Sequence, residues 1–209
     1  MKLALILIAL GGTAACAHAQ NPPPAAPPAD SAVTDSIRQD STRPRIYGRL
    51  SQNDIAIRMR GTDLELRFLP LDPRLISLLA PDAATALQRL VAANRPAIDS
   101  AGRDAGISEP GLALVNFFGV QDGVRFDPQL LTLSVRGRLL RPLAIVPLSP
   151  KWGSGQLDAR ESVMAIYLYQ ELLPVWDPFE VSYGAMTSSD WDRRLPTLDR
   201  ERQRLQRGS

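Results

Sequence analysis

The stretch DIAIRMRGTDLELRFLPL, residues 54–71, decides the fold. In it, apolar and polar residues alternate on both sides of the pair Gly61-Thr62. The apolar positions of this alternation are Ile55, Ile57, Met59, Leu64, Leu66 and Phe68. Alternation with a period of two is typical of a strand that is buried on one face, and the Gly-Thr pair supplies a turn. The stretch therefore predicts two antiparallel strands.

Two later stretches are apolar at nearly every position. They are LALVNFFGV, residues 112–120, and SVMAIYLY, residues 162–169. A short run that is apolar on both faces is typical of a central strand. Asp122-Gly123 follows the first run and is a hairpin signal, so we expect that strand to turn back there.

A second hairpin signal lies between residues 130 and 148. The segments LLTLSV, residues 130–135, and LLRPLAIVPL, residues 139–148, flank the pair Arg136-Gly137. Pro142 and Pro147 have no N–H to donate to a strand neighbour. The second segment is therefore predicted to lie at a sheet edge or to carry a bulge.

Helical signals interrupt the strands between residues 72 and 105. Asp72 can cap a helix that starts at Pro73, and Asp82 can cap a second helix. The second helix is predicted to end at Asn94-Arg95-Pro96, and a third short helix is expected from Pro96 to Ala105.

These elements together predict one mainly β domain over residues 46–209. The segment FEVSY, residues 179–183, adds a strand with Phe179, Val181 and Tyr183 inward. About eight short strands with hairpin turns favour an antiparallel immunoglobulin-like β-sandwich with a helical insertion at about residues 72–105. The composition, 44% hydrophobic and 22% charged, is ordinary for a globular protein.

The N-terminus carries the pattern of an export signal. Lys2 precedes an apolar run of eight residues, Leu3 to Leu10, and small residues follow. Because a membrane span needs about 20 apolar residues, this segment indicates a secretory signal peptide over residues 1–19. We therefore expect an exported protein, either periplasmic or extracellular.

Two processing sites overlap at the end of this signal. Ala17-His18-Ala19 before Gln20 fits general signal peptidase, whose cut would remove Cys16 and His18. Thr13-Ala14-Ala15-Cys16 resembles a bacterial lipobox, although Thr13 stands where Leu is usual. Simple secretion is favoured, and lipidation of Cys16, which would give a membrane-anchored lipoprotein, stays the alternative.

A proline-rich segment, residues 20–45, follows the signal. It contains only two branched aliphatic residues, Val33 and Ile37, and cannot bury enough apolar surface to offset chain entropy. We interpret it as a disordered tether between the processing site and the domain.

The chain combines an export signal, a tether and the hairpin LTLSVRGRLLRPLAIVPL, residues 131–148. This combination resembles the immunoglobulin-like domains of bacterial envelope lipoproteins and secreted proteins. The resemblance implies an accessory or ligand-contacting role in the cell envelope, and it supplies no catalytic residue. The disulfide of antibody-type domains is missing.

Charge and composition exclude several functions. The 24 basic and 22 acidic residues give a net charge of +2, which indicates no nucleic-acid partner. Beyond Cys16 and His18 the chain has no cysteine or histidine, which excludes Ser-His and Cys-His nucleophile pairs and His- or Cys-based zinc and haem sites. We expect no cofactor and no metal.

Paired acids leave one catalytic alternative open. A carbohydrate hydrolase needs only two carboxyl groups, and close pairs occur at Asp158 and Glu161, at Asp177 and Glu180, and at Asp190 and Asp192. Turn initiation and pairing with the many arginines are the commoner uses of such residues.

Three tryptophans are candidate contact residues. Trp152 lies in PKWGSGQ, residues 150–156, which we interpret as a flexible loop, and Trp176 and Trp191 follow. Their rings could contact a sugar or a protein, although packing is the more usual role of tryptophan.

The C-terminus, PTLDRERQRLQRGS, residues 196–209, predicts a helix capped by Thr197. Only Leu198 and Leu205 are apolar, so a frayed and solvated helix is favoured. The alternative is a weak contact between its arginines and an anionic surface, such as membrane headgroups or acidic envelope polymer.

Three functions therefore compete. The preferred one is a non-catalytic envelope module that contacts a protein or a glycan, with one or more of the tryptophans in an exposed patch. The second is a carboxylate-dependent carbohydrate hydrolase, which needs two acids facing each other across a cleft. The third is a purely structural envelope protein.

Overall fold

The computed structural model describes residues 47–207. The predicted signal peptide at residues 1–19, the lipidation candidate Cys16 and the predicted tether at residues 20–45 lie outside the described residues. All described residues belong to one compact unit.

The first sheet has five antiparallel strands in the order β1-β2-β3-β9-β7. They are β1 (Ile57–Arg60), β2 (Leu64–Pro70), β3 (Gly111–Gly119), β9 (Ser162–Tyr169) and β7 (Ala144–Pro147). The predicted strand pair at residues 54–71 is confirmed, because Ile57 pairs with Phe68 and the chain turns at Gly61. The runs at 112–120 and 162–169 are interior strands, as expected.

The second sheet has four antiparallel strands in the order β11-β10-β5-β6. They are β11 (Met186–Ser188), β10 (Glu180–Tyr183), β5 (Leu131–Val135) and β6 (Arg138–Leu140). The predicted hairpin at Arg136-Gly137 joins β5 to β6, and both turn residues have the positive φ angles, 48° and 79°, that this kind of turn requires.

The segment at residues 139–148 differs from the single strand that we expected. It is split between the sheets, because β6 ends at Leu140 and β7 begins at Ala144 in the five-stranded sheet. Both strands are at sheet edges, so Pro147 of β7 removes no interior hydrogen bond, and Pro142 lies between the two strands.

The hairpin expected at Asp122-Gly123 is wrong. Gly123 adopts a positive φ of 70°, but the chain then leaves β3 and forms β4 (Val124–Arg125), which pairs with β8 (Gln156–Leu157). The short 3-10 helices η2 (Pro128–Leu130), after β4, and η3 (Pro150–Ser154), before β8, lie between these two strands in sequence.

Aromatic residues on the inner faces of the two sheets contact one another. The Phe117 ring centroid lies 5.0 Å from that of Phe126 and 5.3 Å from that of Tyr183, and Phe68 lies 6.3 Å from Phe179. Burial of each such ring contributes roughly 1.5–3 kcal/mol, so the inward positions of the strands hold the sheets together. The predicted inward residues Phe179, Val181 and Tyr183 are all buried.

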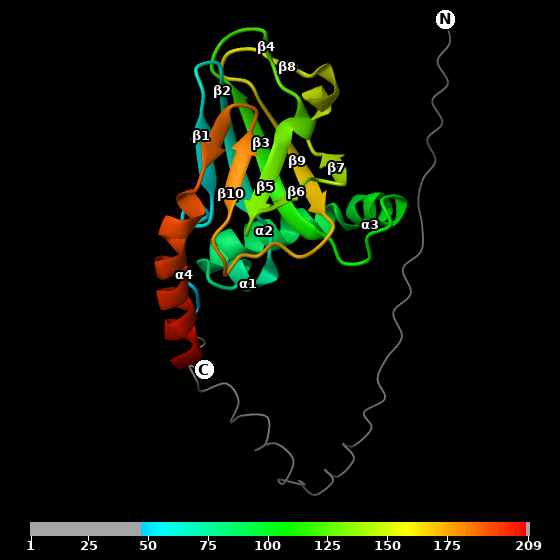
Figure 1. Cartoon of the computed structure of the whole chain (residues 1–209). Coiled ribbons are helices and arrows are strands. Elements are labelled where there is room, and N and C mark those ends of the chain that lie inside the picture. The colour runs from blue at the N-terminus through cyan, green and yellow to red at the C-terminus, as the bar shows by residue number, and fades with distance from the viewer. Residues whose placement is uncertain (1–46, 208–209) are drawn as a thin grey trace, which may run out of the picture. The chain divides into compact units, whose positions relative to one another are not determined.

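Three helices, α1 (Pro73–Ile76), α2 (Pro81–Ala93) and α3 (Arg95–Asp104), form the predicted insertion. The Asp72 side chain caps α1 as expected, accepting a hydrogen bond from the Arg74 N–H at 2.8 Å. The cap of α2 is Ala80, so Asp82 belongs to the first turn instead. Helix α3 packs on β7 and β9, at one end of the five-stranded sheet (Figure 1).

The C-terminal helix α4 (Asp190–Arg207) is longer than predicted, and it is not a frayed tail. It starts six residues before Pro196, so Thr197 lies inside it and Trp191 and Leu198 are buried in its packed face. The helix begins before residues 196–209, the stretch for which it was predicted, and so includes Trp191 and Leu195. Mainly antiparallel β structure with a few short helices and a C-terminal helix is confirmed.

Candidate binding surface

Trp191 cannot serve as the contact residue that the sequence suggested. Its side chain is 0% exposed, its ring stacks on Phe179 at 4.8 Å, and its Nε1–H donates to the Val175 carbonyl oxygen at 3.3 Å. This ring anchors α4 to the sheets.

Trp152 and Trp176 are half-buried. Trp152 lies in η3, not in the expected flexible loop, and its ring packs 5.4 Å from that of Phe126 and 5.9 Å from that of Phe117. The Arg202 guanidinium lies 4.5 Å from the Trp176 ring centroid. No ring contact joins one tryptophan to another within residues 47–207, so the structure does not bring the three together.

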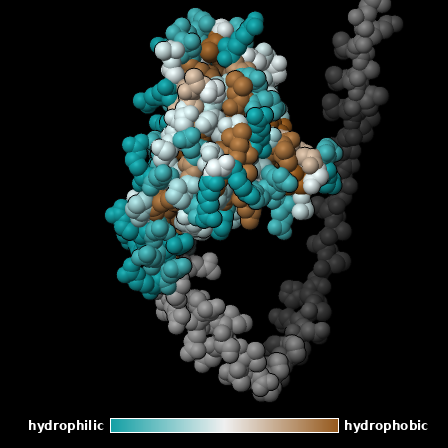
Figure 2. Space-filling view, in the orientation of Figure 1, coloured by the Kyte–Doolittle hydropathy of each residue, from teal (hydrophilic) through white to brown (hydrophobic). Residues whose placement is uncertain are grey.

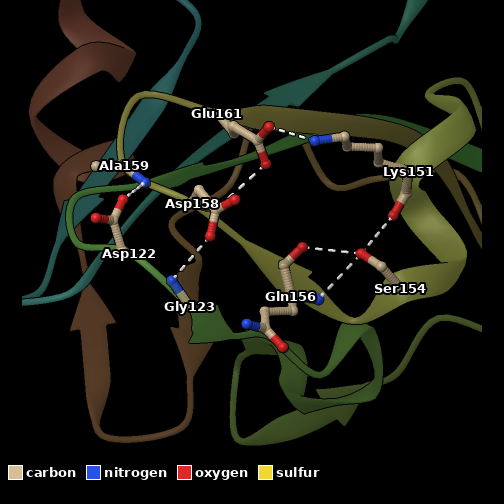
Figure 3. Close-up of polar contacts among 8 residues, drawn as sticks. All are labelled: Asp122, Gly123, Lys151, Ser154, Gln156, Asp158, Ala159 and Glu161. Atoms are coloured by element: carbon tan, nitrogen blue, oxygen red, sulfur yellow. Dashed lines mark hydrogen bonds and ion pairs between the residues drawn. The ribbon is translucent and has the colours of Figure 1, made fainter.

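The acid pair Asp158 and Glu161 belongs to a network that joins two loops (Figure 3). The Glu161 carboxylate forms an ion pair with Lys151 and accepts a hydrogen bond from the Asp158 N–H at 3.2 Å. Lys151 also holds the pKa of Glu161 below its ordinary value. A general acid of a glycosidase needs a raised pKa, so this shift has the opposite sign.

The neighbouring contacts of this network are also structural. Asp158 Oδ1 accepts from the Gly123 N–H at 3.2 Å, and Asp122 Oδ1 accepts from the Ala159 N–H at 2.9 Å. These bonds fasten the β3–β4 loop to the β8–β9 loop (Figure 3). The carboxylates therefore satisfy backbone donors.

One acid of each of the other two pairs is bound to an arginine. Asp177 forms an ion pair with Arg136 at 2.7 Å, and Asp190 with Arg193. Among the described residues, no group of three or more acidic, histidine or cysteine side chains is arranged to hold a metal ion.

Exposed apolar residues on the side of the four-stranded sheet are scattered. Figure 2 shows this side, with apolar areas separated by hydrophilic ones, and a hydrophilic surface along α4. Several of the α4 arginines are neutralised locally, since Arg202 pairs with Asp199 and Arg204 with Glu201. The alternative contact between this helix and an anionic surface stays a prediction.

The outer face of the five-stranded sheet is covered over only part of its length. Toward α3, the outward residues Ile166 and Leu168 are fully buried, and Gly102 of α3 lies against Leu168. Toward the other end, the outward residues of β1, β2, β3 and β9 are exposed or half-buried. We call this uncovered part the arginine face; its residues are Arg58, Arg60, Glu65, Arg67, Asn116, Phe118 and Met164.

Two arginines of this face lie directly opposite each other. Arg58 of β1 and Arg67 of β2 are partners in the strand register, and Asn116 of β3 is the next residue in the same row. Like charges in this position destabilise a strand pair. Their guanidinium groups converge, since both donate to Asn53 Oδ1, at 2.8 Å and 3.4 Å respectively.

A third arginine reaches the same asparagine from α4. Arg194 donates to the backbone oxygen of Asn53 at 2.8 Å and to that of Asp54 at 3.2 Å. None of Arg58, Arg67 and Arg194 forms an ion pair in the part of the chain that the structure describes. Three arginines therefore meet at Asn53, and of these Arg194 is also attracted by the charges of Asp190 and Asp54.

Polar atoms at this cluster lack partners. Arg67 Nε, Arg194 Nε and Asn116 Oδ1 are buried, and they have no hydrogen-bond partner among the described residues. Burial lowers the pKa of Arg67, and repulsion from Arg58 lowers it further. The arrangement thus carries an electrostatic cost that its own residues do not offset.

A hollow of about 280 Å³ lies over these groups. Its lining consists of Arg58, Glu65, Arg67, Asn116 and Phe118. Glu65 is held by Arg60 at 3.4 Å, so the positive charge of Arg58 and Arg67 is left over. A larger hollow of about 440 Å³ between α1 and α2 is mainly apolar and has only Arg95 as a charged lining residue.

The sequence analysis missed the arginine face. Arg58 and Arg67 occupy the polar positions of alternating strands, where solvated arginines are ordinary. The register of β1 with β2 brings Arg58 and Arg67 together. Arg194 joins them from a helix that lies 127 residues further along the chain than Arg67.

Comparison with protein-family models, with curated proteins and with solved structures finds no match. Within residues 47–207, no helix combines the length and the apolar character that a membrane span requires.

Proposed function

We propose that this protein is a non-catalytic binding module of the cell envelope that contacts a protein or a glycan. The observation that carries the proposal is the arginine face, where Arg58 and Arg67 lie opposite each other without a carboxylate partner among the described residues. Since like charges in this position repel each other, a negatively charged partner gives the pairing a role. Phe118 and Met164, 36% and 38% exposed, add apolar contact area beside the charges.

The cellular setting of this proposal comes from the sequence. The pattern of residues 1–19 supports export, and the chain would be periplasmic or extracellular, released after Ala19 or anchored through Cys16. The tether would hold the domain away from its anchoring or processing site.

The finer fold assignment belongs to the same proposal. We take the two sheets to be a divergent immunoglobulin-like sandwich, because the chain crosses from one sheet to the other between β6 and β7 and the sheets share a core of interleaved aromatic rings. The helical insertion between β2 and β3 sets it apart from antibody domains.

Neither alternative is favoured by a specific observation. A carbohydrate hydrolase would use two acids across a cleft, whereas Asp158, Glu161, Asp177 and Asp190 are engaged with basic side chains or backbone N–H groups. A purely structural protein would have no use for the unpaired arginines.

The proposal is tested by sedimentation of the purified chain with cell-envelope fractions. We expect wild type to sediment with the envelope, and the double variant Arg58→Gln/Arg67→Gln to lose at least tenfold in affinity, since each charge-assisted contact contributes more than about 1.4 kcal/mol. The matched control Arg89→Gln/Arg103→Gln removes the same charge from exposed positions of α2 and α3. Equal loss in both double variants would contradict the proposal.

A further inference from the structure

We infer that the arginine face is a phosphate-binding site, in which Arg58, Arg67 and Asn116 hold the phosphate group and Phe118 contacts the organic body that carries it. This inference rests on the proposed function, because it names the chemical group that the binding surface recognises.

The convergence of the guanidinium groups supports an oxyanion. The Nη2 atoms of Arg58 and Arg67 reach the same acceptor, Asn53 Oδ1, so one external oxygen placed beside it would also lie within reach of both. Guanidinium groups present forked donors that match phosphate oxygens, whereas an amide oxygen supplies no compensating charge. Asn53 therefore leaves most of the donor capacity unused.

Donors from two neighbouring strands support the same conclusion. Arg67 lines the hollow, and although its Nε is buried, its Nη2 donates only to Asn53 Oδ1, at 3.4 Å. The Asn116 side-chain amide also has an N–H₂ group that can donate to an oxyanion. An oxyanion in the hollow would satisfy donors from β2 and β3 at once.

Phosphate fits this hollow better than a single carboxylate. With Glu65 paired to Arg60, Arg58 and Arg67 leave two positive charges at the hollow. A phosphate monoester carries nearly two negative charges at neutral pH, whereas a carboxylate carries one. The hollow of about 280 Å³ leaves room beside the phosphate, where the exposed ring of Phe118 offers an apolar wall.

The binding test is calorimetric titration of the purified chain with three small anions. We expect a hexose 6-phosphate to bind at least tenfold more tightly than acetate, with inorganic phosphate between them because it lacks the body that contacts Phe118. Arg58→Gln should weaken binding of the hexose phosphate about tenfold, and the control Arg89→Gln should leave it unchanged. Equal affinity for acetate and hexose phosphate, or equal effects of the two variants, would overturn the inference.

A second binding experiment distinguishes a lipid headgroup from a soluble or glycan-borne phosphate. Phosphatidylcholine vesicles with and without phosphatidic acid present the same phosphate monoester on a lipid. Binding to both the hexose phosphate and the phosphatidic acid vesicles supports a site that accepts lipid headgroups. Binding to the hexose phosphate alone supports a soluble or glycan-borne phosphate, and binding to neither overturns the site.

The variant Asn116→Asp distinguishes loss of the site from loss of the fold. It places a carboxylate next to Arg67 in the strand register, so we expect the thermal unfolding midpoint to rise while affinity for the hexose phosphate falls at least tenfold. A fall in both quantities, or retained affinity, would contradict the inference.

The two proposals fail separately. If the Arg58→Gln/Arg67→Gln chain loses the envelope fraction but wild type binds no phosphate, the binding function stands and the phosphate assignment is wrong. If wild type binds phosphate but does not sediment with the envelope, the phosphate assignment stands and the envelope-binding function is wrong.

Discussion

Trp191 joins the C-terminal helix to the sheets. Its side chain is fully buried, and it contacts Phe179, which itself packs against Phe68 of the five-stranded sheet. One residue thus connects α4 with the shared core, which explains why a helix with few apolar residues is held in place.

Replacement of this residue tests that account. We expect Trp191→Ala to lower the free energy of unfolding by about 3–5 kcal/mol, because it removes a large buried ring and leaves a cavity. Trp191→Phe should cost clearly less, since it keeps an aromatic ring beside Phe179. Urea unfolding followed by circular dichroism measures both, and a loss below about 1 kcal/mol in the alanine variant would contradict the account.

Glu201 makes the attachment of α4 dependent on pH. Its carboxylate is almost buried, pairs with Arg204 and accepts a hydrogen bond from the Arg49 N–H at 2.8 Å. The hydrogen bond from Arg204 is the main cause that holds the pKa of Glu201 below its ordinary value near 4.5. Because the pKa is lowered in the folded state, this stabilisation is present above the unfolded value and is lost as pH falls through the folded one.

The variant Glu201→Gln measures that contribution. We expect it to lower the free energy of unfolding by about 1–2 kcal/mol near neutral pH, and the difference from wild type to shrink as pH falls below about 4. Chemical unfolding at several pH values gives this difference. Glu109→Gln, which changes an exposed glutamate, is the control. A difference that is independent of pH would show that the charge of Glu201 contributes nothing.

Among single residues, the sequence predicted buried positions better than partners. The strand residues Ile57, Phe68 and Val181 are inward, as their alternation indicated. Trp191, one of the three candidate contact residues, is buried. The sequence alone does not separate the two roles, because tryptophan suits both a core and a contact surface. No local sequence pattern marks Arg58 and Arg67 as part of a binding surface, because they are brought together by the register of β1 with β2.

At the scale of elements, the β5–β6 hairpin shows how a turn selects its residues. Gly137 has a φ of 79°, and no atom lies within 4 Å of the position that a Cβ would take. Conformation alone therefore requires glycine there.

The matched pair Gly137→Ala and Gly153→Ala separates conformation from space. Both positions are open, but Gly153 is not among the glycines with positive φ. We expect Gly137→Ala to destabilise the protein by roughly 1 kcal/mol and Gly153→Ala to change stability by less than about 0.5 kcal/mol. Thermal unfolding of both variants measures the difference, and equal effects would contradict this explanation of the turn.

Elements were predicted well, but their assembly was not. Most strands and the α1–α3 insertion follow from local periodicity and capping. The division of residues 139–148 between two sheets, and the pairing of β4 with β8, depend on contacts between distant parts of the chain. Helix α4 is longer than predicted, because the prediction placed its cap at Thr197 whereas the helix begins at Asp190.

At the scale of the whole molecule, partial coverage of one sheet creates the candidate site. Helix α3 buries Ile166 and Leu168 at one end of the outer face, and the other end carries the arginine face. Neither the coverage nor the convergence of Arg194 with Arg58 can be read from local patterns, because both depend on the completed fold.

Contact between the arginine face and the partner is the central feature of the proposed function. Hydrogen–deuterium exchange of the chain, free and bound to envelope fractions, tests it most directly. We expect slower exchange on binding in the Asn53 turn and at the exposed ends of β1, β2 and β3, with no change in α2 and α3. Protection confined to α2, α3 or the four-stranded sheet, with these strands unchanged, would contradict the account.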